Sequence, residues 1–138
     1  YTDIKQSKKL SKILPVESAD MRYGYIAPYE FSDRKYDGGY DKIPYIKDIF
    51  KVNPNFSEDE YDGELPCWSL TALLDVFPCS KESPIVNLTR GGWNPSFTGR
   101  WFATWEDEDK NVFYSCDEIS PVDAVVELIL KLHEEKLL

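Results

Sequence analysis

Cys67 and His133 are the residues of this chain whose types could support nucleophilic catalysis. Cys67 lies near the start of a run from Leu65 to Pro78 in which only Asp75 is charged, and we expect this run to form a buried helix. A helix N-terminus lowers the pKa of a thiol, and a thiolate is the nucleophile of cysteine hydrolases. His133 is the only histidine, so it would have to serve as the base. A small cysteine hydrolase or transferase is therefore one hypothesis; the alternative is that Cys67 is an inert core residue, as most free cysteines are.

A group of aromatic residues forms the second candidate site. Trp93, Trp101 and Trp105 lie close together in the sequence, and Trp101 and Trp105 would share one face of a strand. Tyr114 on a neighbouring strand could extend that face, and Arg100 flanks it. Such a face either packs against a helix, where each tryptophan buries a large area, or stays open as a binding surface for a ligand or a partner protein.

Four residues match part of a calcium-binding loop, but the match fails at one decisive position. Asp107, Asp109, Asn111 and Glu118 fall at positions 1, 3, 5 and 12 of that loop, whereas position 6, which requires glycine, is Val112. The sequence also lacks the phosphate-binding, dinucleotide-binding, zinc-protease and serine-hydrolase motifs. We therefore predict no metal site and no cofactor.

The charge balance limits the partners that the protein can bind. The chain has a net charge of −9, and a surface this acidic repels nucleic-acid backbones and anionic membranes. We expect no direct binding to nucleic acid or membrane, and a partner that is another protein. An alternative is that the acidic pattern imitates DNA phosphates, which would make the protein an acidic DNA-mimic inhibitor.

The N-terminal segment is basic although the protein is acidic. The first fourteen residues carry a net charge of +3, which leaves −12 for the remaining 124. Lys5, Lys8, Lys9 and Lys12 follow the i, i+3, i+4, i+7 spacing of one helix face. This face is either simply solvated, or it docks onto the acidic body of the protein itself or onto an acidic partner.

Cysteine usage and hydropathy favour a cytoplasmic protein. The three cysteines, Cys67, Cys79 and Cys116, are odd in number and form no CxxC pair, which favours a reducing compartment. No apolar run approaches the roughly 20 residues of a membrane span, and no secretory signal is present. Because the sequence begins with Tyr1 rather than methionine, removal of a leader stays open.

The local patterns predict an N-terminal helix, an irregular segment and a buried helix in the first half of the chain. Asp3 and Gln6 are spaced as a capping box for a helix over residues 3–14. Residues 16–64 are rich in aromatic and turn-forming residues; we expect an irregular segment, with a short edge strand within residues 23–31 and helical turns at residues 45–50. The buried helix over residues 65–78 follows.

Three strands and a final helix are predicted in the second half. The strands are expected at Ile85–Arg90, Arg100–Trp105 and Val112–Cys116, paired as an antiparallel meander. Ser120 caps the last helix and Pro121 begins it. Its apolar face is expected to comprise Val122, Val125, Val126, Ile129, Leu132 and Leu137. The whole chain, residues 1–138, is thus predicted to be a single α+β domain: a three-stranded antiparallel meander with an N-terminal, a central buried and a C-terminal helix, the last two packed on one sheet face.

Several segments together resemble a known group of proteins. The segments are KQSKKLSKILP, SADM, LPCWSLTALLDVFP and PVDAVVELILKLHEEKLL. With them the chain resembles a family of small proteins common in gut bacteria and their phages, and the resemblance implies an intracellular accessory protein of a phage or mobile element. No activity is assigned to that family, so no residue role follows from it. The leading hypothesis is a non-catalytic macromolecular interaction protein, since no nucleophile, acid or base has a clear partner.

Overall fold

The computed structural model describes residues 1–26, 29–31, 34–36, 39–46, 64–77, 86–91, 99–107 and 109–138. The contacts within the chain divide it into two compact units, Tyr1–Ser69 and Leu70–Leu138. Each unit combines helices with antiparallel sheets, so the α+β class is confirmed. That residues 1–138 form a single domain stays a prediction.

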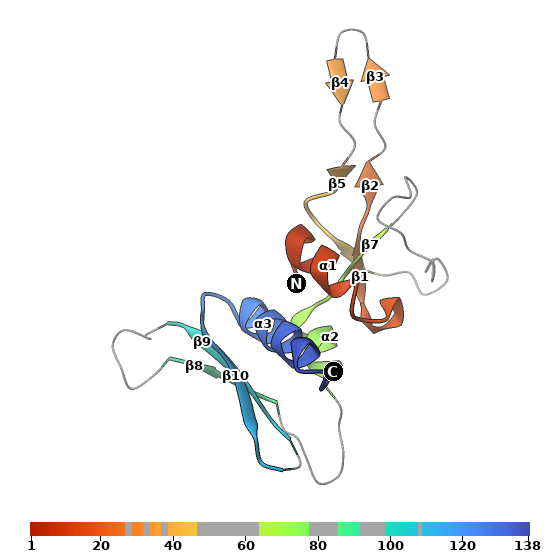
Figure 1. Ribbon diagram of the computed structural model, residues 1–138. Helices are drawn as coiled ribbons and strands as arrows, with labels where there is room; N and C mark the ends of the chain where they lie inside the picture. The colour runs from red at the N-terminus through yellow and green to blue at the C-terminus, as the bar shows by residue number, and fades with distance from the viewer. Residues whose placement is uncertain are drawn as a thin grey trace. The chain divides into compact units, whose positions relative to one another are not determined.

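In the residues of the first unit that the structure describes, there are one α-helix, one 3-10 helix and seven short strands; Figure 1 shows their course. In chain order these are α1 (Ile4–Leu10), the 3-10 helix Val16–Ser18, β1 (Met21–Tyr23), β2 (Tyr25–Ile26), β3 (Tyr29–Phe31), β4 (Arg34–Tyr36), β5 (Gly39–Tyr40), β6 (Tyr45–Ile46) and β7 (Leu65–Cys67). A three-stranded antiparallel sheet has the order β6-β1-β7, while β2 pairs with β5 and β3 with β4. The prediction of one meander as the only sheet was therefore wrong.

The helix predicted over residues 65–78 was wrong at its start, because β7 occupies its first residues. Pro66 lacks an amide hydrogen, which a strand tolerates at a sheet edge, and β7 is an edge strand. The backbone of Trp68 is hydrogen-bonded to Thr2: the Thr2 amide donates to the Trp68 carbonyl (2.9 Å), and the Trp68 amide donates to Thr2 Oγ1 (3.1 Å). In a helix over residues 65–78 the Trp68 carbonyl would accept from the amide four residues on, whereas here it accepts from the Thr2 amide, and α2 begins at Leu70.

Of two further expectations for residues 16–64, the described strands correct one and confirm the other. Residues 45–46 form strand β6 on the edge of the β6-β1-β7 sheet rather than helical turns; residues 47–50 lie outside the described residues. Within residues 23–31 the structure has the end of β1 and all of β2 and β3; β2 and β3 each belong to a two-stranded sheet, in which every strand is an edge strand, so the expected short edge strand is present. Short aromatic and β-branched stretches suit such strands.

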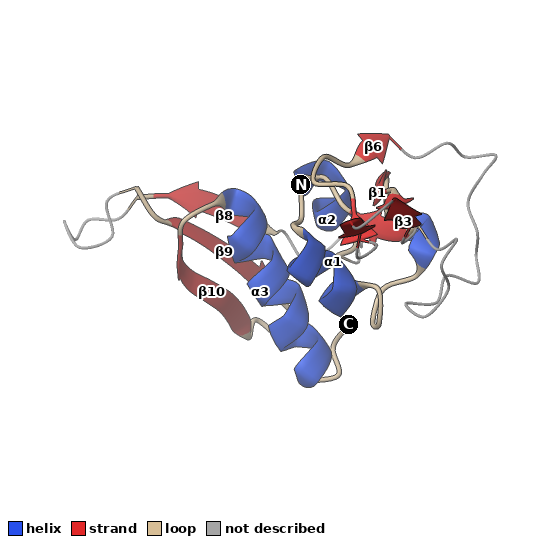
Figure 2. Cartoon of the chain, turned by 90° about the horizontal axis from the view of Figure 1, so that it is seen from above, coloured by secondary structure: helices blue, strands red, loops and turns tan. Residues whose placement is uncertain are grey.

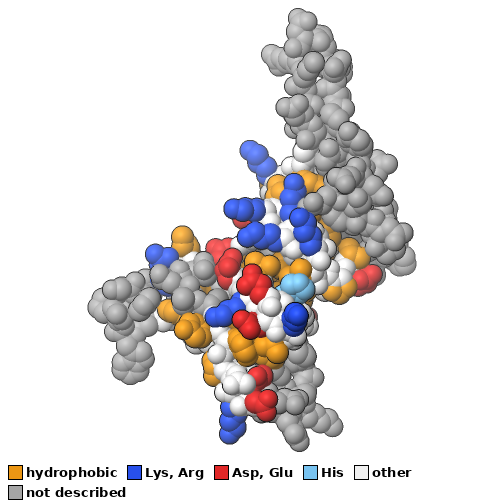
Figure 3. Space-filling model, in the orientation of Figure 1, with side chains coloured by type: hydrophobic (Ala, Val, Ile, Leu, Met, Phe, Trp, Pro, Cys, Tyr) orange, Lys and Arg blue, Asp and Glu red, His pale blue; other side chains and the backbone are white. Residues whose placement is uncertain are grey.

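Helix α1 has the predicted N-terminus and an earlier end. The Gln6 amide donates to Asp3 Oδ1 (2.7 Å) and the Asp3 amide to Gln6 Oε1 (2.9 Å), which confirms the capping box. The helix ends at Leu10, beyond which the Ile13 amide bonds to the Leu10 carbonyl three residues back (3.0 Å) and tightens the chain into a turn. Ser7 and Leu10 of this helix are buried. Figure 3 shows basic side chains gathered over the same helix.

The second unit contains the predicted meander. Its elements are α2 (Leu70–Asp75), β8 (Asn87–Arg90), β9 (Trp101–Glu106), β10 (Val112–Glu118) and α3 (Pro121–Glu134). The strands pair antiparallel in the order β10-β9-β8, with a bulge in β10 between Ser115 and Glu118. Helix α3 packs against β9 and β10, and α2 packs against α3 (Figure 2).

Helix α3 supplies most of the core of this unit. Its start is as predicted: the Asp123 amide donates to the Ser120 hydroxyl (3.1 Å), and Pro121 is the first helical residue. Its buried side chains are Ala124, Val125, Val126, Leu128, Ile129 and Leu132. The prediction lacked Ala124 and Leu128, which are buried because α3 contacts both the sheet and α2. Leu137, expected on the apolar face, follows the end of the helix and is exposed.

Truncation of Leu128 should destabilise the second unit strongly. Leu128 is fully buried, so Leu128→Ala removes apolar contacts and leaves a cavity, at an expected cost of about 2–5 kcal/mol in the free energy of unfolding. Urea unfolding followed by circular dichroism measures this change. Glu134→Ala on the exposed side of α3 is the control, with an expected change within about 0.5 kcal/mol. Equal effects of the two substitutions would contradict the packing described for α3.

Candidate functional site

Cys67 lies in strand β7 and is completely buried. Its thiol donates to the Thr2 carbonyl (3.4 Å) and accepts a hydrogen bond from Thr2 Oγ1 (3.5 Å). Burial raises the pKa of the Cys67 thiol, and the hydrogen bonds from Thr2 and Ser7 offset that rise only in part. The helix N-terminus that was expected to lower this pKa is absent at Cys67, since the residue belongs to a strand. A nucleophilic cysteine needs the opposite environment, exposed and electropositive.

The thiol is one member of a buried hydrogen-bond network centred on Thr2. The Thr2 and Ser7 hydroxyls are 2.8 Å apart, and both residues are completely buried. The Tyr23 hydroxyl donates to the Thr2 carbonyl (2.8 Å), and burial raises the pKa of this phenol as well. With the two hydrogen bonds between Thr2 and the backbone of Trp68, the network satisfies polar groups that would be costly to bury alone. Its geometry is that of a structural anchor between the N-terminal segment and β7.

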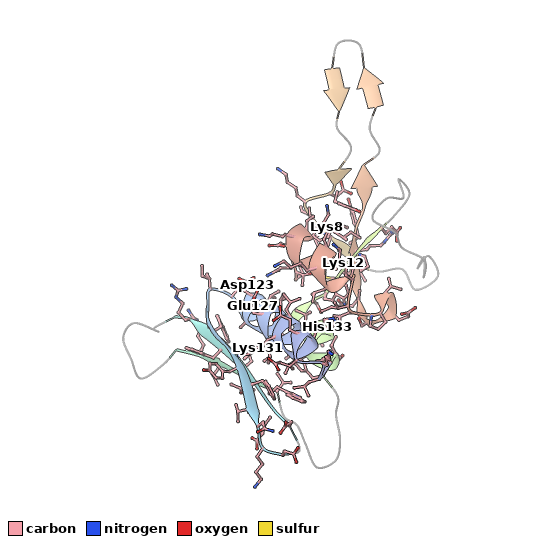
Figure 4. The ribbon with its side chains drawn as sticks, viewed as in Figure 1. Lys8, Lys12, Asp123, Glu127, Lys131 and His133 are labelled. Carbon is pink, nitrogen blue, oxygen red and sulfur yellow. The ribbon has the colours of Figure 1, made fainter. Side chains whose placement is uncertain are left out.

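His133 lies in the last turn of α3, where Figure 4 labels it. Its imidazole is exposed, and Nδ1 lies 3.2 Å from the Leu138 carbonyl oxygen. His133 belongs to the second unit and Cys67 to the first, so neither unit contains both members of the predicted pair.

The aromatic residues of the second candidate site are placed in different environments. Trp105 is buried, and its ring centroid lies 5.7 Å from that of Phe113 at a tilt of 41°. Trp101 and Arg100 are half-buried, whereas Tyr114 is 54% exposed. Trp93 lies outside the described residues.

The register of the sheet separates Trp105 from Tyr114. Trp105 is opposite Phe113, and Tyr114 is opposite Thr104, so Tyr114 points to the side of Thr104 rather than that of Trp105. The face that includes Ala103 and Trp105 is buried at these two residues. The two aromatic residues that were predicted to share a surface are therefore on opposite faces of one sheet.

The other side of this sheet is an exposed face, which we call the outward sheet face. By the register it comprises Asn87, Thr89, Phe102, Thr104, Glu106, Val112 and Tyr114, with Glu106 directly opposite Val112. Val112 and Tyr114 are 56% and 54% exposed, and Thr89 is exposed as well. Val112 and Phe102 were not among the residues predicted for a binding surface, although strict alternation along the two strands puts them on the side of Tyr114.

Two aromatic rings of this unit lie beneath basic side chains. The Lys131 ammonium lies 4.9 Å from the ring centroid of Tyr114, and it also donates to the Tyr114 carbonyl (3.3 Å). Figure 4 labels Lys131 on α3. The Arg90 guanidinium lies 5.8 Å from the centroid of Trp101. Such pairs are worth about 0.5–1 kcal/mol at exposed positions and orient the ring.

The acidic turn between β9 and β10 closes on itself. The Asn111 amide donates to Asp107 Oδ1 (2.7 Å), and the Asn111 side chain donates to Oδ2 (2.9 Å). These bonds, with that from the side chain foremost, lower the pKa of the Asp107 carboxyl. Both carboxylate oxygens are thus engaged in the turn. In the described part of the chain no three potential ligands are grouped as a metal site would require, and no helix there combines the length and hydropathy of a membrane span.

Comparison of the chain with models of protein families, with curated proteins and with solved structures finds no match.

Cys67 should react slowly with alkylating agents in the folded protein. Because its thiol is completely buried and its pKa is raised, we expect alkylation by iodoacetamide at pH 7 to be at least about ten-fold slower than that of a model thiol, limited by local opening. Mass spectrometry that resolves each cysteine measures the rate at position 67. The urea-unfolded protein is the control and should react at the rate of the model thiol. Alkylation of native Cys67 faster than the model thiol would contradict a structural role.

Proposed function

We propose that this protein acts without catalysis, by binding another protein through the outward sheet face. The observation that carries the proposal is that Val112 and Tyr114 are both more than half exposed on one face of the sheet, whereas the opposite face is buried at Ala103 and Trp105. Exposed apolar side chains that lie together on a rigid sheet are a common feature of protein contact sites.

The environment of Tyr114 suits an interface anchor. Tyrosine combines a large apolar ring with a polar hydroxyl, and it is enriched among the residues that dominate binding energy. Lys131 holds the ring from one side, so binding would cost little side-chain entropy. Covering the exposed parts of Val112 and Tyr114 would contribute on the order of 1 kcal/mol each. We therefore take Tyr114 as the centre of the proposed contact.

The two other hypotheses have less support from the geometry. Catalysis by Cys67 and His133 would require a thiolate at a completely buried sulfur and a base that belongs to the other unit. A DNA mimic would be a special case of protein binding, in which the partner is a DNA-binding enzyme; it stays a prediction from the net charge of −9. A cytoplasmic location and a role as a phage or mobile-element accessory protein likewise stay predictions.

Photo-crosslinking tests the proposed contact directly. With p-benzoylphenylalanine in place of Tyr114, irradiation in the native host should yield a covalent adduct with a specific protein, visible on a denaturing gel and identified by mass spectrometry. The control carries the same photo-reactive residue in place of Tyr45, a residue of the first unit that is also 54% exposed. Val112→Asp should lower the yield of the adduct at position 114, because a charge next to the ring must be desolvated on binding.

The position of the adduct shows whether the outward sheet face is the contact surface. Adducts at position 45 without adducts at position 114, or no adduct at either position, would show that the outward sheet face is not the contact surface.

A further inference from the structure

The second surface of interest is the set of four lysines on and directly after α1, which we call the α1 lysine stripe. It comprises Lys5, Lys8, Lys9 and Lys12, all of them exposed. Their i, i+3, i+4, i+7 spacing places them on one side of the helical turns. Figure 3 shows basic side chains gathered over α1, and Figure 4 labels Lys8 and Lys12 there.

The orientation of the α1 lysine stripe is fixed by what α1 buries. Ser7 and Leu10 are completely buried, and the Ser7 hydroxyl is hydrogen-bonded to that of Thr2. Lys8 is further constrained, because its ammonium lies 5.6 Å from the ring centroid of Tyr40. The lysines are therefore presented outward by a helix whose other side is anchored.

Helix stability explains only part of the α1 lysine stripe. Lys8 and Lys9 lie in the last turn of α1, where cations interact favourably with the helix dipole. Lys5 lies in the first turn, where the dipole disfavours a cation, and this turn contains no acidic residue. Lysines at i, i+4, such as Lys5 and Lys9, also repel each other. The position of Lys5 and its repulsion from Lys9 are thus unfavourable for α1 itself.

The size of the α1 lysine stripe limits its partner to a short one. The seven residues of α1 span about 10 Å, which is close to the Debye length of about 8 Å at physiological salt. The chain outside the first fourteen residues carries a net charge of −12. This net negative charge repels a long polyanion, which carries many charges, more strongly than a short acidic peptide, which carries few.

The use of lysine rather than arginine also favours a short acidic peptide as the partner. Arginine recognises phosphate groups through a planar fork of donors, while lysine acts as a compact point charge that accepts varied geometries. The α1 lysine stripe contains lysine only. Carboxylate side chains on a peptide are a suitable counterpart for such point charges, with each exposed pair contributing about 0.2–1 kcal/mol.

We infer that the α1 lysine stripe is a docking surface for a short acidic segment of a partner protein. This inference does not rest on the outward sheet face, because α1 belongs to the first unit and the sheet to the second. Affinity would be modest, would arise from several weak ion pairs, and would fall with increasing salt.

Fluorescence anisotropy with a labelled short poly-glutamate peptide tests this inference on the full chain. The variant Lys5→Gln/Lys8→Gln/Lys9→Gln should bind the peptide on the order of ten-fold more weakly than the unmodified protein. Glutamine has nearly the helix propensity of lysine, so α1 should persist, and circular dichroism checks this. The control Lys42→Gln/Lys110→Gln/Lys136→Gln, at three other exposed lysines, brings the net charge to the same −12 and should bind nearly as the unmodified protein does.

Two further probes separate the acidic peptide from other anions. A single-stranded oligonucleotide and vesicles rich in phosphatidylserine should bind more weakly than the peptide at the same salt concentration. Raising the salt from about 20 mM to about 200 mM should weaken the peptide complex. The inference is overturned if the peptide does not bind at low salt, if both triple variants lose affinity equally, or if the oligonucleotide or the vesicles bind more tightly than the peptide.

Discussion

The hydrogen bonds around Thr2 determine the roles that β7 and α1 can take in the first unit. Thr2, near the start of the chain, is completely buried, and its hydroxyl accepts a hydrogen bond from the amide of Trp68, 66 residues further on. One of its bonds reaches Ser7, which fixes the buried side of α1 and turns the α1 lysine stripe outward. Two others reach Cys67 and hold its sulfur inside the core. A single polar residue thus accounts both for an unreactive environment at the cysteine and for a basic surface on the helix, because each of its partners must stay paired once water is excluded.

In the second unit, the alternation of side chains along the strands decides which residues are buried and which are exposed. Residues 101–106 carry bulky side chains on both sides of β9, and α3 covers only one of them. Trp105 supplies buried apolar area beneath α3, and Phe113, its partner on the adjacent strand, packs beside it. The same pairing turns Tyr114 to the opposite side, where Lys131 lies over its ring. The proposed contact surface is therefore the side of the sheet that α3 does not cover. The packing of α3 on the other side keeps the sheet rigid.

Local signals predicted the parts of the fold that depend on neighbours in sequence. The capping box at Asp3, the start of α3 at Pro121 and the meander were all predictable, because caps, turns and alternation act within a few residues. Strand β7 was not, because the residues that hold it, among them Thr2 and Tyr23, are far away in the chain. At the candidate sites, the inert alternative for Cys67 was foreseen, and the face of Tyr114 follows from the register. The approach of Lys131 depends on how α3 packs, which no local pattern specifies.

The Thr2 network holds Cys67 and α1 in place, and Cys67 has a structural role. The decisive measurement is the unfolding of Thr2→Val, compared with that of Thr71→Val at an exposed threonine of α2. Valine keeps the shape of Thr2 but leaves the Trp68 amide and the Ser7 hydroxyl without this partner. We expect a loss of about 1–3 kcal/mol in the free energy of unfolding for Thr2→Val, with faster alkylation of Cys67, and a change within about 0.5 kcal/mol for Thr71→Val. Equal stability of the two variants, with Cys67 still protected in Thr2→Val, would contradict this role of the Thr2 network.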